Sequence, residues 1–436
     1  MVLHFSSNNR VNVLERLIVF CSVFLLFLTL NPFPVWETYR GGIFSSSGIP
    51  VTKIIYFVVI ALGMFYALLH SRMGNDIFIS VLSLIAAGVI LILFSGVMQG
   101  TFPALLAMNI IVLAIMLYLS TELKIEIYDK FRAVFAILLI PGIFFSIIAF
   151  LGINFPHDIL VSDTAIKTNN YVQYLHYPFA VQITKSYDVF GNLNRFRLCG
   201  LFDEPGRVGT MCALFLASEN YNLKKKTNKL LLVEGILSLS VAFFLLSLVY
   251  FLIDAIINRN KKKFYIILGL VIAFVVFRLI PFNNIALQTL QDRMSFSSGR
   301  LVGDNRANDD FIAFIESFFR DTNVYNVLFG FGSGNTYNAM TTLNNGYASS
   351  FLALFSDFGI VGFTAIILWP IIFWKVNRKN NGKSHTAFIL VLIFLINLYQ
   401  RPSAFSPSYM FPLIGGICLL NKSYTESYNA IEESRR

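Results

Sequence analysis

Long runs of apolar residues alternate with short polar segments along most of the chain. A membrane-crossing helix needs about 20 mostly apolar residues, with some spread, so these runs predict transmembrane helices. The predicted spans are 17–30, 52–69, 77–97, 103–120, 131–151, 205–221, 230–257, 264–281, 346–373, 386–400 and 408–420. The pattern predicts an all-α polytopic membrane protein, with residues 1–436 forming a single integral membrane domain.

The stretch 230–257 can be interpreted in two ways. It lies between two basic runs, Lys224–Lys229 and Arg259–Lys263, and one crossing would put these runs on opposite sides, against the tendency of basic residues to stay cytoplasmic. Its 28 residues are long for one upright helix and short for two. We favour a hairpin turning near Ser238-Leu239-Ser240, which gives about 12 crossings and two cytoplasmic termini. A single tilted helix, giving about 11 crossings, is the alternative.

Composition agrees with a membrane location. The chain is 56% hydrophobic and only 13% charged, with a mean hydropathy of +0.67, whereas soluble domains are typically about 25% charged. The net charge of +10 does not indicate nucleic-acid binding, because most lysines fall in the predicted cytoplasmic loops. The four cysteines are scattered, with no disulfide framework and no metal-binding spacing.

Two predicted outer loops, 152–203 and 282–345, are far longer than ordinary connections, which indicates function or disorder. Both are rich in aromatic residues, so disorder is disfavoured. In the second loop, apolar residues recur at helical spacing and predict an amphipathic helix near 307–320. That helix either lies on the outer membrane surface or packs over the transmembrane helices.

The second loop contains no lysine, and its basic residues are Arg293, Arg300, Arg306 and Arg320. Arginine binds phosphate oxygens with a planar fork of donors, whereas lysine is a hydrated point charge, so arginine without lysine indicates selection for geometry. The loop also holds six acidic residues, which excludes a simple polyanion groove. The alternative is that each arginine pairs with a nearby aspartate, the candidates being Asp292, Asp304, Asp309 and Asp321.

The sequence RFRLCGLFDEPGRVGT joins the first outer loop to the sixth span. Pro205 suits the first turn of a helix, and the free N–H groups of that turn, with Arg207, would attract an anion. Arg195 and Arg197 alternate with one residue between them, so both could project from one face of an extended segment. Together these groups could bind a diphosphate. Glu204 could take a proton from an attacking hydroxyl, or it could simply cap the helix.

The sequence GFGSG at 330–334 is another glycine-rich candidate for phosphate binding. It has no lysine and lacks the strand-to-helix context of a phosphate-binding loop. A turn is therefore the better interpretation.

Several of these segments resemble the O-antigen polymerase and ligase superfamily of bacterial surface-polysaccharide assembly. The similar pieces are RFRLCGLFDEPGRVG, ILSLSVAFF, DRMSFSSGR followed by VLFGFGSG, and SSFLALFSDFGIVGF, in the family's order over roughly residues 190–365. Ligases of this superfamily carry a histidine-asparagine pair before an acid-x-Gly-Ile element. Here Asp357-Phe358-Gly359-Ile360 matches that element, but the pair is Ala348-Ser349, which favours a polymerase over a ligase.

The resemblance implies a GT-C-like fold with two large periplasmic loops, in the bacterial inner membrane. It implies a metal-independent, inverting glycosyltransferase without cofactors, which joins undecaprenyl-diphosphate-linked repeat units into O-antigen or a related polysaccharide. Glu204 is then the candidate base, and the diphosphate or glycan would be bound by Arg195, Arg197, Arg207, Arg293, Arg300 and Arg306. Expected partners are the lipid-linked glycans, the bilayer and a chain-length regulator, and no nucleic acid. A flippase for the same glycans is the main rival.

Overall fold

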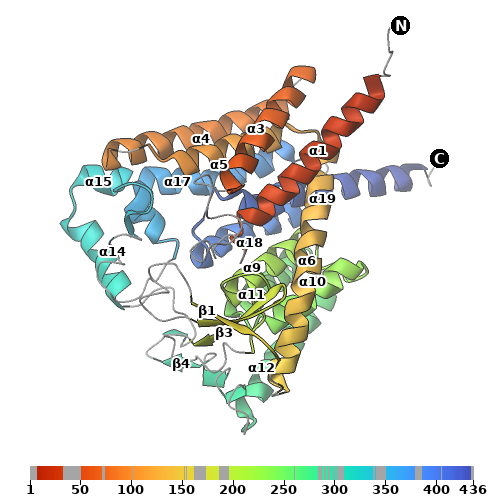
Figure 1. The fold of residues 1–436 in the computed structure, drawn as a ribbon, viewed down its shortest axis with the longest axis vertical. Helices are drawn as coiled ribbons and strands as arrows, with labels where there is room; N and C mark the ends of the chain where they lie inside the picture. Colours follow the sequence, from red (N-terminus) through yellow and green to blue (C-terminus); the bar gives the residue numbers. More distant parts are fainter. Residues whose placement is uncertain are drawn as a thin grey trace.

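A computed structural model shows a mostly helical chain (Figure 1). It describes residues 7–32, 51–70, 74–100, 102–151, 153, 155–161, 173–185, 196–259, 261–282, 287–288, 291–292, 295–297, 300–301, 309–336, 339, 350–378, 385–403 and 405–433. The helices are α1 Ser7–Leu28, α3 Val51–Leu69, α4 Asn75–Gln99, α5 Ala104–Tyr118, α6 Thr121–Phe150, α9 Pro205–Ser218, α10 Lys226–Leu237, α11 Val241–Ile257, α12 Lys261–Leu279, α14 Asp309–Asp321, α15 Val324–Phe329, α17 Ala353–Asn377, α18 His385–Gln400 and α19 Pro407–Glu433.

Several helices are suited to a membrane. Within the described residues, four helices are long and apolar enough to cross a bilayer: α3, α4, α6 and α17. Shorter apolar helices occur at α5, α11, α12 and α18. The chain is therefore a helical membrane protein, as its hydropathy predicts; the number of crossings remains a prediction.

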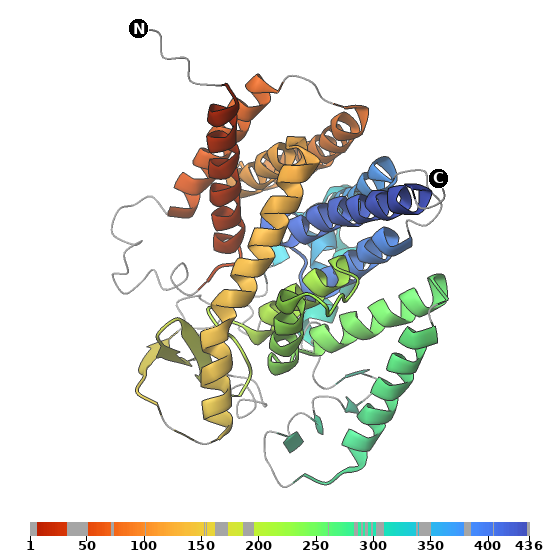
Figure 2. The same ribbon diagram turned by 90° about the vertical axis from the view of Figure 1, so that its right-hand side faces the viewer.

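Helix α9 occupies the centre of the helical body. It packs against α10, α11, α18 and α19 (Figures 1 and 2). Every side chain in it except that of Arg207 is buried. Small residues allow this close packing. A Cβ atom at Gly209 would lie 2.8 Å from the Ser238 hydroxyl and 2.9 Å from that of Ser240. The turn between α10 and α11 thus sits directly against the first half of α9.

The stretch 230–257 forms two helices, and the single-helix alternative is wrong. Helix α10 ends at Leu237 and α11 begins at Val241, with Leu239 between them at a positive φ of 45°. The Leu237 carbonyl accepts a 2.9 Å hydrogen bond from the chain just before α9, whereas the Tyr250 hydroxyl bonds to Asn220 just after α9. Helix α11 therefore runs back along α9, and the two basic runs lie at the same end of the helix pair.

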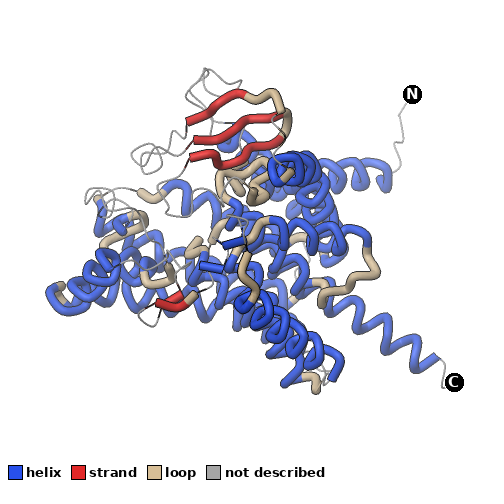
Figure 3. Tube along the Cα trace, turned by 90° about the horizontal axis from the view of Figure 1, so that it is seen from below, coloured by secondary structure: helices blue, strands red, loops and turns tan. Residues whose placement is uncertain are grey.

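The first outer loop contains a sheet that the sequence analysis missed (Figure 3). Strands β1 Asp158–Val161, β2 Gln173–Tyr177 and β3 Ala180–Lys185 form an antiparallel sheet in the order β1-β2-β3. One face buries a small core of Leu160, Tyr174, Val181, Ile183 and Cys199. In the second loop, β4 Phe296–Ser297 pairs with β5 Arg300–Leu301. The all-α expectation therefore holds for the membrane body but not for the first outer loop.

The amphipathic helix expected near 307–320 corresponds to α14. Its apolar face is buried at Phe311, Ile315 and Phe318, and it packs against Ala353 at the start of α17. The structure thus places α14 over the helical body, which was one of the two positions considered for it.

Gly359 gives the first test of this fold. It interrupts α17 with a φ of 65°, and a Cβ atom there would collide with the Leu328 carbonyl oxygen. We expect Gly359→Ala to lower the free energy of unfolding in detergent by about 2–4 kcal/mol. Gly269, on the exposed surface of α12 with no atom within 4 Å of the added Cβ, is the matched control. Gly269→Ala should be neutral or stabilising by up to about 1 kcal/mol. If the two substitutions changed the free energy of unfolding equally, this would contradict the kink at Gly359.

Candidate functional site

A cluster of four charged side chains lies where the ends of three helices meet. The members, here called the α9-start cluster, are Asp203, Glu204, Arg207 and Arg401. Asp203, Glu204 and Arg207 lie at the start of α9, and Arg401 directly follows α18. The end of α1 joins them, because the chain just after it forms a β-bridge between Pro32 and Phe202.

Two ion pairs hold the cluster together. The Arg401 guanidinium donates a 2.6 Å hydrogen bond to Glu204 Oε2, and an Arg207 nitrogen lies 3.4 Å from Asp203 Oδ1. Arg207 also donates to the Leu30 carbonyl, at the carbonyl-rich end of α1. Burial disfavours the charged form of Arg401, but the negative charge of Glu204 outweighs it and raises the pKa of the guanidinium. Arg401 therefore remains cationic.

The two arginines still have donors to offer. Their side chains are largely enclosed, 16% exposed for Arg207 and 10% for Arg401. Among the described residues, the Nε atom of each has no hydrogen-bond partner. A buried N–H without a partner is unfavourable, so these two groups would gain from an additional acceptor. The arrangement suits an anion with several oxygens.

Glu204 occupies the cap position of α9 but does not act as a cap. Its backbone is extended, and its side chain accepts no hydrogen bond from the first turn of the helix. The carboxylate instead pairs with Arg401, and the side chain is 31% exposed. The capping interpretation is therefore wrong. The Glu204 carboxylate is therefore turned toward Arg401 and remains partly open to solvent.

Two hydrogen bonds join the sheet of the first outer loop to the segment that carries the α9-start cluster. The Tyr174 hydroxyl donates a 3.0 Å hydrogen bond to the Asp203 carbonyl, and the Val181 N–H donates a 2.7 Å bond to Gly200. Burial, reinforced by the charge of Asp203, raises the pKa of Tyr174 well above its usual range. The phenol therefore stays protonated and keeps donating this bond at physiological pH.

Arg197 lies close to this region but has a different partner. Its side chain is 7% exposed, and Nε donates a 3.0 Å hydrogen bond to the Ser238 carbonyl at the turn between α10 and α11. Arg197 thus binds the hairpin turn to the segment that precedes α9. This hydrogen bond places Arg197 beside the hairpin.

The other predicted arginines cannot be placed in the same way. Arg195, Arg293 and Arg306 lie outside the described residues. Arg300 is described by its backbone alone, in β5. The segment that leads into α17 approaches the α9-start cluster, since the rings of Phe351 and Tyr399 are 6.0 Å apart and Tyr399 lies two residues before Arg401.

Arg401 is the site residue that the sequence analysis missed. The available signal was an arginine directly at the end of an apolar span, in the sequence Tyr399-Gln400-Arg401-Pro402, where an ionisable side chain needs a partner. Its partner Glu204 is 197 residues away, so no local pattern could reveal the pair.

The glycine-rich turn at 330–334 forms hydrogen bonds with a carboxylate of the same chain. The Asp357 carboxylate accepts a 3.0 Å hydrogen bond from the Gly334 N–H and a 2.9 Å bond from the Thr336 N–H. The Thr336 hydroxyl donates to the same carboxylate at 2.8 Å. The turn interpretation is therefore confirmed. The acid of the Asp-Phe-Gly-Ile element organises the second loop instead of facing a ligand.

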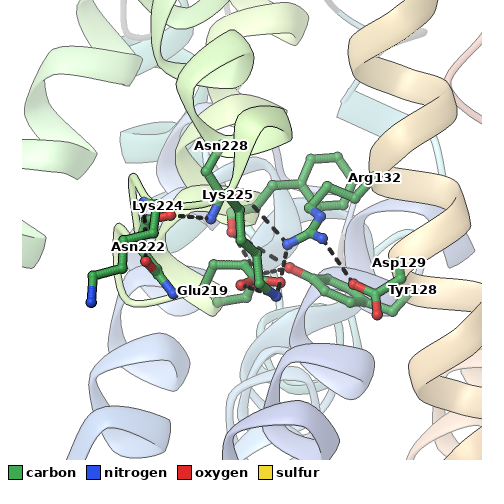
Figure 4. A network of polar contacts seen from close by, with 10 residues as sticks. Tyr128, Asp129, Arg132, Glu219, Asn222, Lys224, Lys225 and Asn228 are labelled. Carbon is green, nitrogen blue, oxygen red and sulfur yellow. Dashed lines mark hydrogen bonds and ion pairs between the residues drawn. The ribbon is translucent and has the colours of Figure 1, made fainter.

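A second charged cluster lies at the other end of α9 (Figure 4). This α9-end cluster consists of Asp129, Arg132, Glu219 and Lys225. Arg132 pairs with Glu219 and, at 2.9 Å, with Asp129, while Lys225 reaches Glu219 at 2.7 Å. Two positive and two negative charges balance here, and Asn228 also accepts a hydrogen bond from Arg132. We infer that the α9-end cluster holds the basic run that begins at Lys224 against α6.

Among the described residues, no three histidine, cysteine, aspartate or glutamate side chains are arranged to hold a metal ion. In comparisons with protein-family models, with curated proteins and with solved structures, no match to this chain was found. The functional assignment therefore depends on the chemistry of the α9-start cluster and on the sequence resemblance.

Proposed function

We propose that this protein polymerises oligosaccharide repeat units carried on a lipid diphosphate, as an inverting glycosyltransferase at the outer face of a bacterial inner membrane. The observation that carries the proposal is the α9-start cluster, which combines two enclosed arginines with a partly open carboxylate. It lies at the N-terminus of a buried helix, where backbone N–H groups favour an anion. The sequence resemblance supplies the lipid-linked substrate class.

In the proposed reaction, Glu204 accepts the proton of an acceptor sugar hydroxyl. The hydroxyl oxygen then bonds to the anomeric carbon of the donor sugar, from the face opposite to the diphosphate. The bond between that carbon and the diphosphate oxygen breaks, and its electron pair leaves with the lipid diphosphate, so the configuration inverts. Arg207 and Arg401 stabilise the negative charge that develops on the leaving group, which they do best where water is largely excluded.

One observation favours the rival transporter. Glu234 on α10 is fully buried, and neither of its carboxylate oxygens has a partner among the described residues. An acid buried inside a membrane protein is often part of a proton-coupled transport path. A flippase for the same lipid-linked glycans is therefore retained as the second candidate function.

The deciding experiment reconstitutes the purified protein in liposomes with a lipid-diphosphate-linked repeat unit on the same side as the outer loops. Elongation should appear as a ladder of lipid-linked chains in mass spectra, each step adding one repeat. Glu204→Gln, which keeps the size of the side chain but cannot take a proton, should remove the ladder. Transbilayer movement of the lipid without any longer chains would refute the polymerase and support the transporter.

A further inference from the structure

The C-terminal half of α6 carries an exposed apolar stripe. Ile137, Ile140, Phe144 and Ile147 are 46–59% exposed and recur at helical spacing, so they lie on one face. Helix α6 is among the helices long and apolar enough to cross a bilayer. We interpret this stripe as a surface that faces lipid.

The β2–β3 hairpin lies beside this part of α6 and not beyond its end (Figure 2). The ring of Tyr177 stacks on Phe145 at 4.2 Å, and Ala180 belongs to the same small apolar cluster. Phe145 comes five residues before the end of α6, which corresponds to about 7.5 Å along the helix axis. The tip of the hairpin is therefore at the depth of the lipid-facing stripe.

The tip itself is apolar, although the conformation of the turn does not require apolar side chains. Tyr177 pairs with Ala180, so Pro178 and Phe179 form a two-residue turn. Phe179 has a φ of 61°, a conformation for which glycine or asparagine is normally chosen. Its side chain is nevertheless an aromatic ring that is 70% exposed. A bulky apolar residue in a strained, exposed position indicates a function for the ring.

Neighbouring side chains extend the same apolar surface. Phe155, 42% exposed, lies against Phe144 of the stripe with ring centroids 6.2 Å apart. Ile159 is 55% exposed and pairs with Leu175, whose side chain is buried against Phe145. The exposed apolar surface of α6 therefore extends through Phe155 toward the sheet, with the exposed His157 packed on Tyr177 beside it.

We propose that the Pro178–Phe179 turn inserts into the outer leaflet of the bilayer and anchors the sheet to the membrane surface. The partner is the lipid itself, because the patch is apolar, aromatic and continuous with the lipid-facing stripe of α6. The inference does not depend on the proposed function. Since Tyr174 and Val181 bond to the segment 200–203, the anchored sheet would also fix the depth of the α9-start cluster.

The test places a tryptophan at the tip. Phe179→Trp is prepared in the full-length protein, reconstituted in nanodiscs, and its emission is compared with that of the parent protein, which has three tryptophans. The additional emission should be shifted to shorter wavelength. Lipids brominated on their acyl chains should quench it at least twofold more strongly than aqueous iodide does.

Two reference positions calibrate the result. Asp158→Trp, on β1 with a side chain that is 87% exposed, should be quenched by iodide and spared by the brominated lipids. Ile147→Trp, on the stripe of α6, should behave like a residue in lipid. If position 179 behaves like position 158, the anchor is refuted. If it is shielded from both quenchers, another protein surface covers it, and the lipid assignment is equally overturned.

Discussion

Arg207→Ala is expected to slow the elongation of lipid-linked chains by at least about 100-fold, the usual effect of removing one preplaced donor to a developing anion. The side chain already donates to the Leu30 carbonyl and pairs with Asp203, and its buried Nε atom has no partner among the described residues. Arg207→Lys should restore little activity, because an ammonium group cannot hold this fork of partners and a phosphate oxygen at once. The measurement is the initial rate of ladder formation in liposomes, normalised to folded protein.

The matched control for Arg207 is an arginine of the second outer loop. Arg320 on α14 is 75% exposed and pairs with its neighbour Asp321, an interaction worth little at an exposed surface. Arg320→Ala should elongate chains at the parent rate. If Arg207→Ala also does so, the α9-start cluster is not the site of phosphate binding.

Loss of Glu219 should produce the largest effect on stability. Its side chain is 3% exposed and holds both Arg132 and Lys225, and Arg132 is itself only 7% exposed. Glu219→Ala leaves a buried guanidinium short of its main partner, which typically destabilises a protein by about 3–5 kcal/mol. Denaturation in mixed micelles, followed by far-ultraviolet circular dichroism, measures this change.

Asp129 provides the comparison for Glu219, since it pairs with the same arginine but is 42% exposed. Asp129→Ala should lower the free energy of unfolding by less than about 1 kcal/mol, because water screens the pair and can replace the carboxylate. If both variants lost the same free energy of unfolding, the ion pairs of Arg132 would not explain why the α9-end cluster is stable.

The helices could be predicted from sequence because their signal is local and repeated over many residues. The break between α10 and α11 was also predictable, since the basic runs at Lys224 and Arg259 cannot both be cytoplasmic with a single crossing between them. The sheet at 158–185 was not predictable in this way. Its strands are short, β1 is separated from β2 by residues 162–172, and its two faces are buried against residues from elsewhere in the chain, Phe145 and Cys199.

The candidate site was predictable only in part, and for a related reason. Sequence spacing placed Glu204 and Arg207 three residues apart at the start of one helix, and the structure brings both into the same cluster. Sequence spacing could not predict Arg401, because local spacing carries no information about an ion pair between distant helices. Whether Glu204 caps the helix likewise depends on the direction of its side chain. That direction is set by its partner Arg401, which the sequence does not reveal.

The length of α9 has a consequence for the membrane around the protein. Its 14 residues span about 21 Å, with a charged cluster at each end, whereas the hydrocarbon core of a bilayer is about 30 Å thick. The polar ends of this buried helix are therefore closer together than the two headgroup layers of an undisturbed bilayer. Because other helices surround α9, we expect substrate to reach the α9-start cluster inside the protein, below the general plane of the headgroups. Bilayer thickness then becomes a variable that controls access to the site, and lipids with shorter acyl chains should favour it.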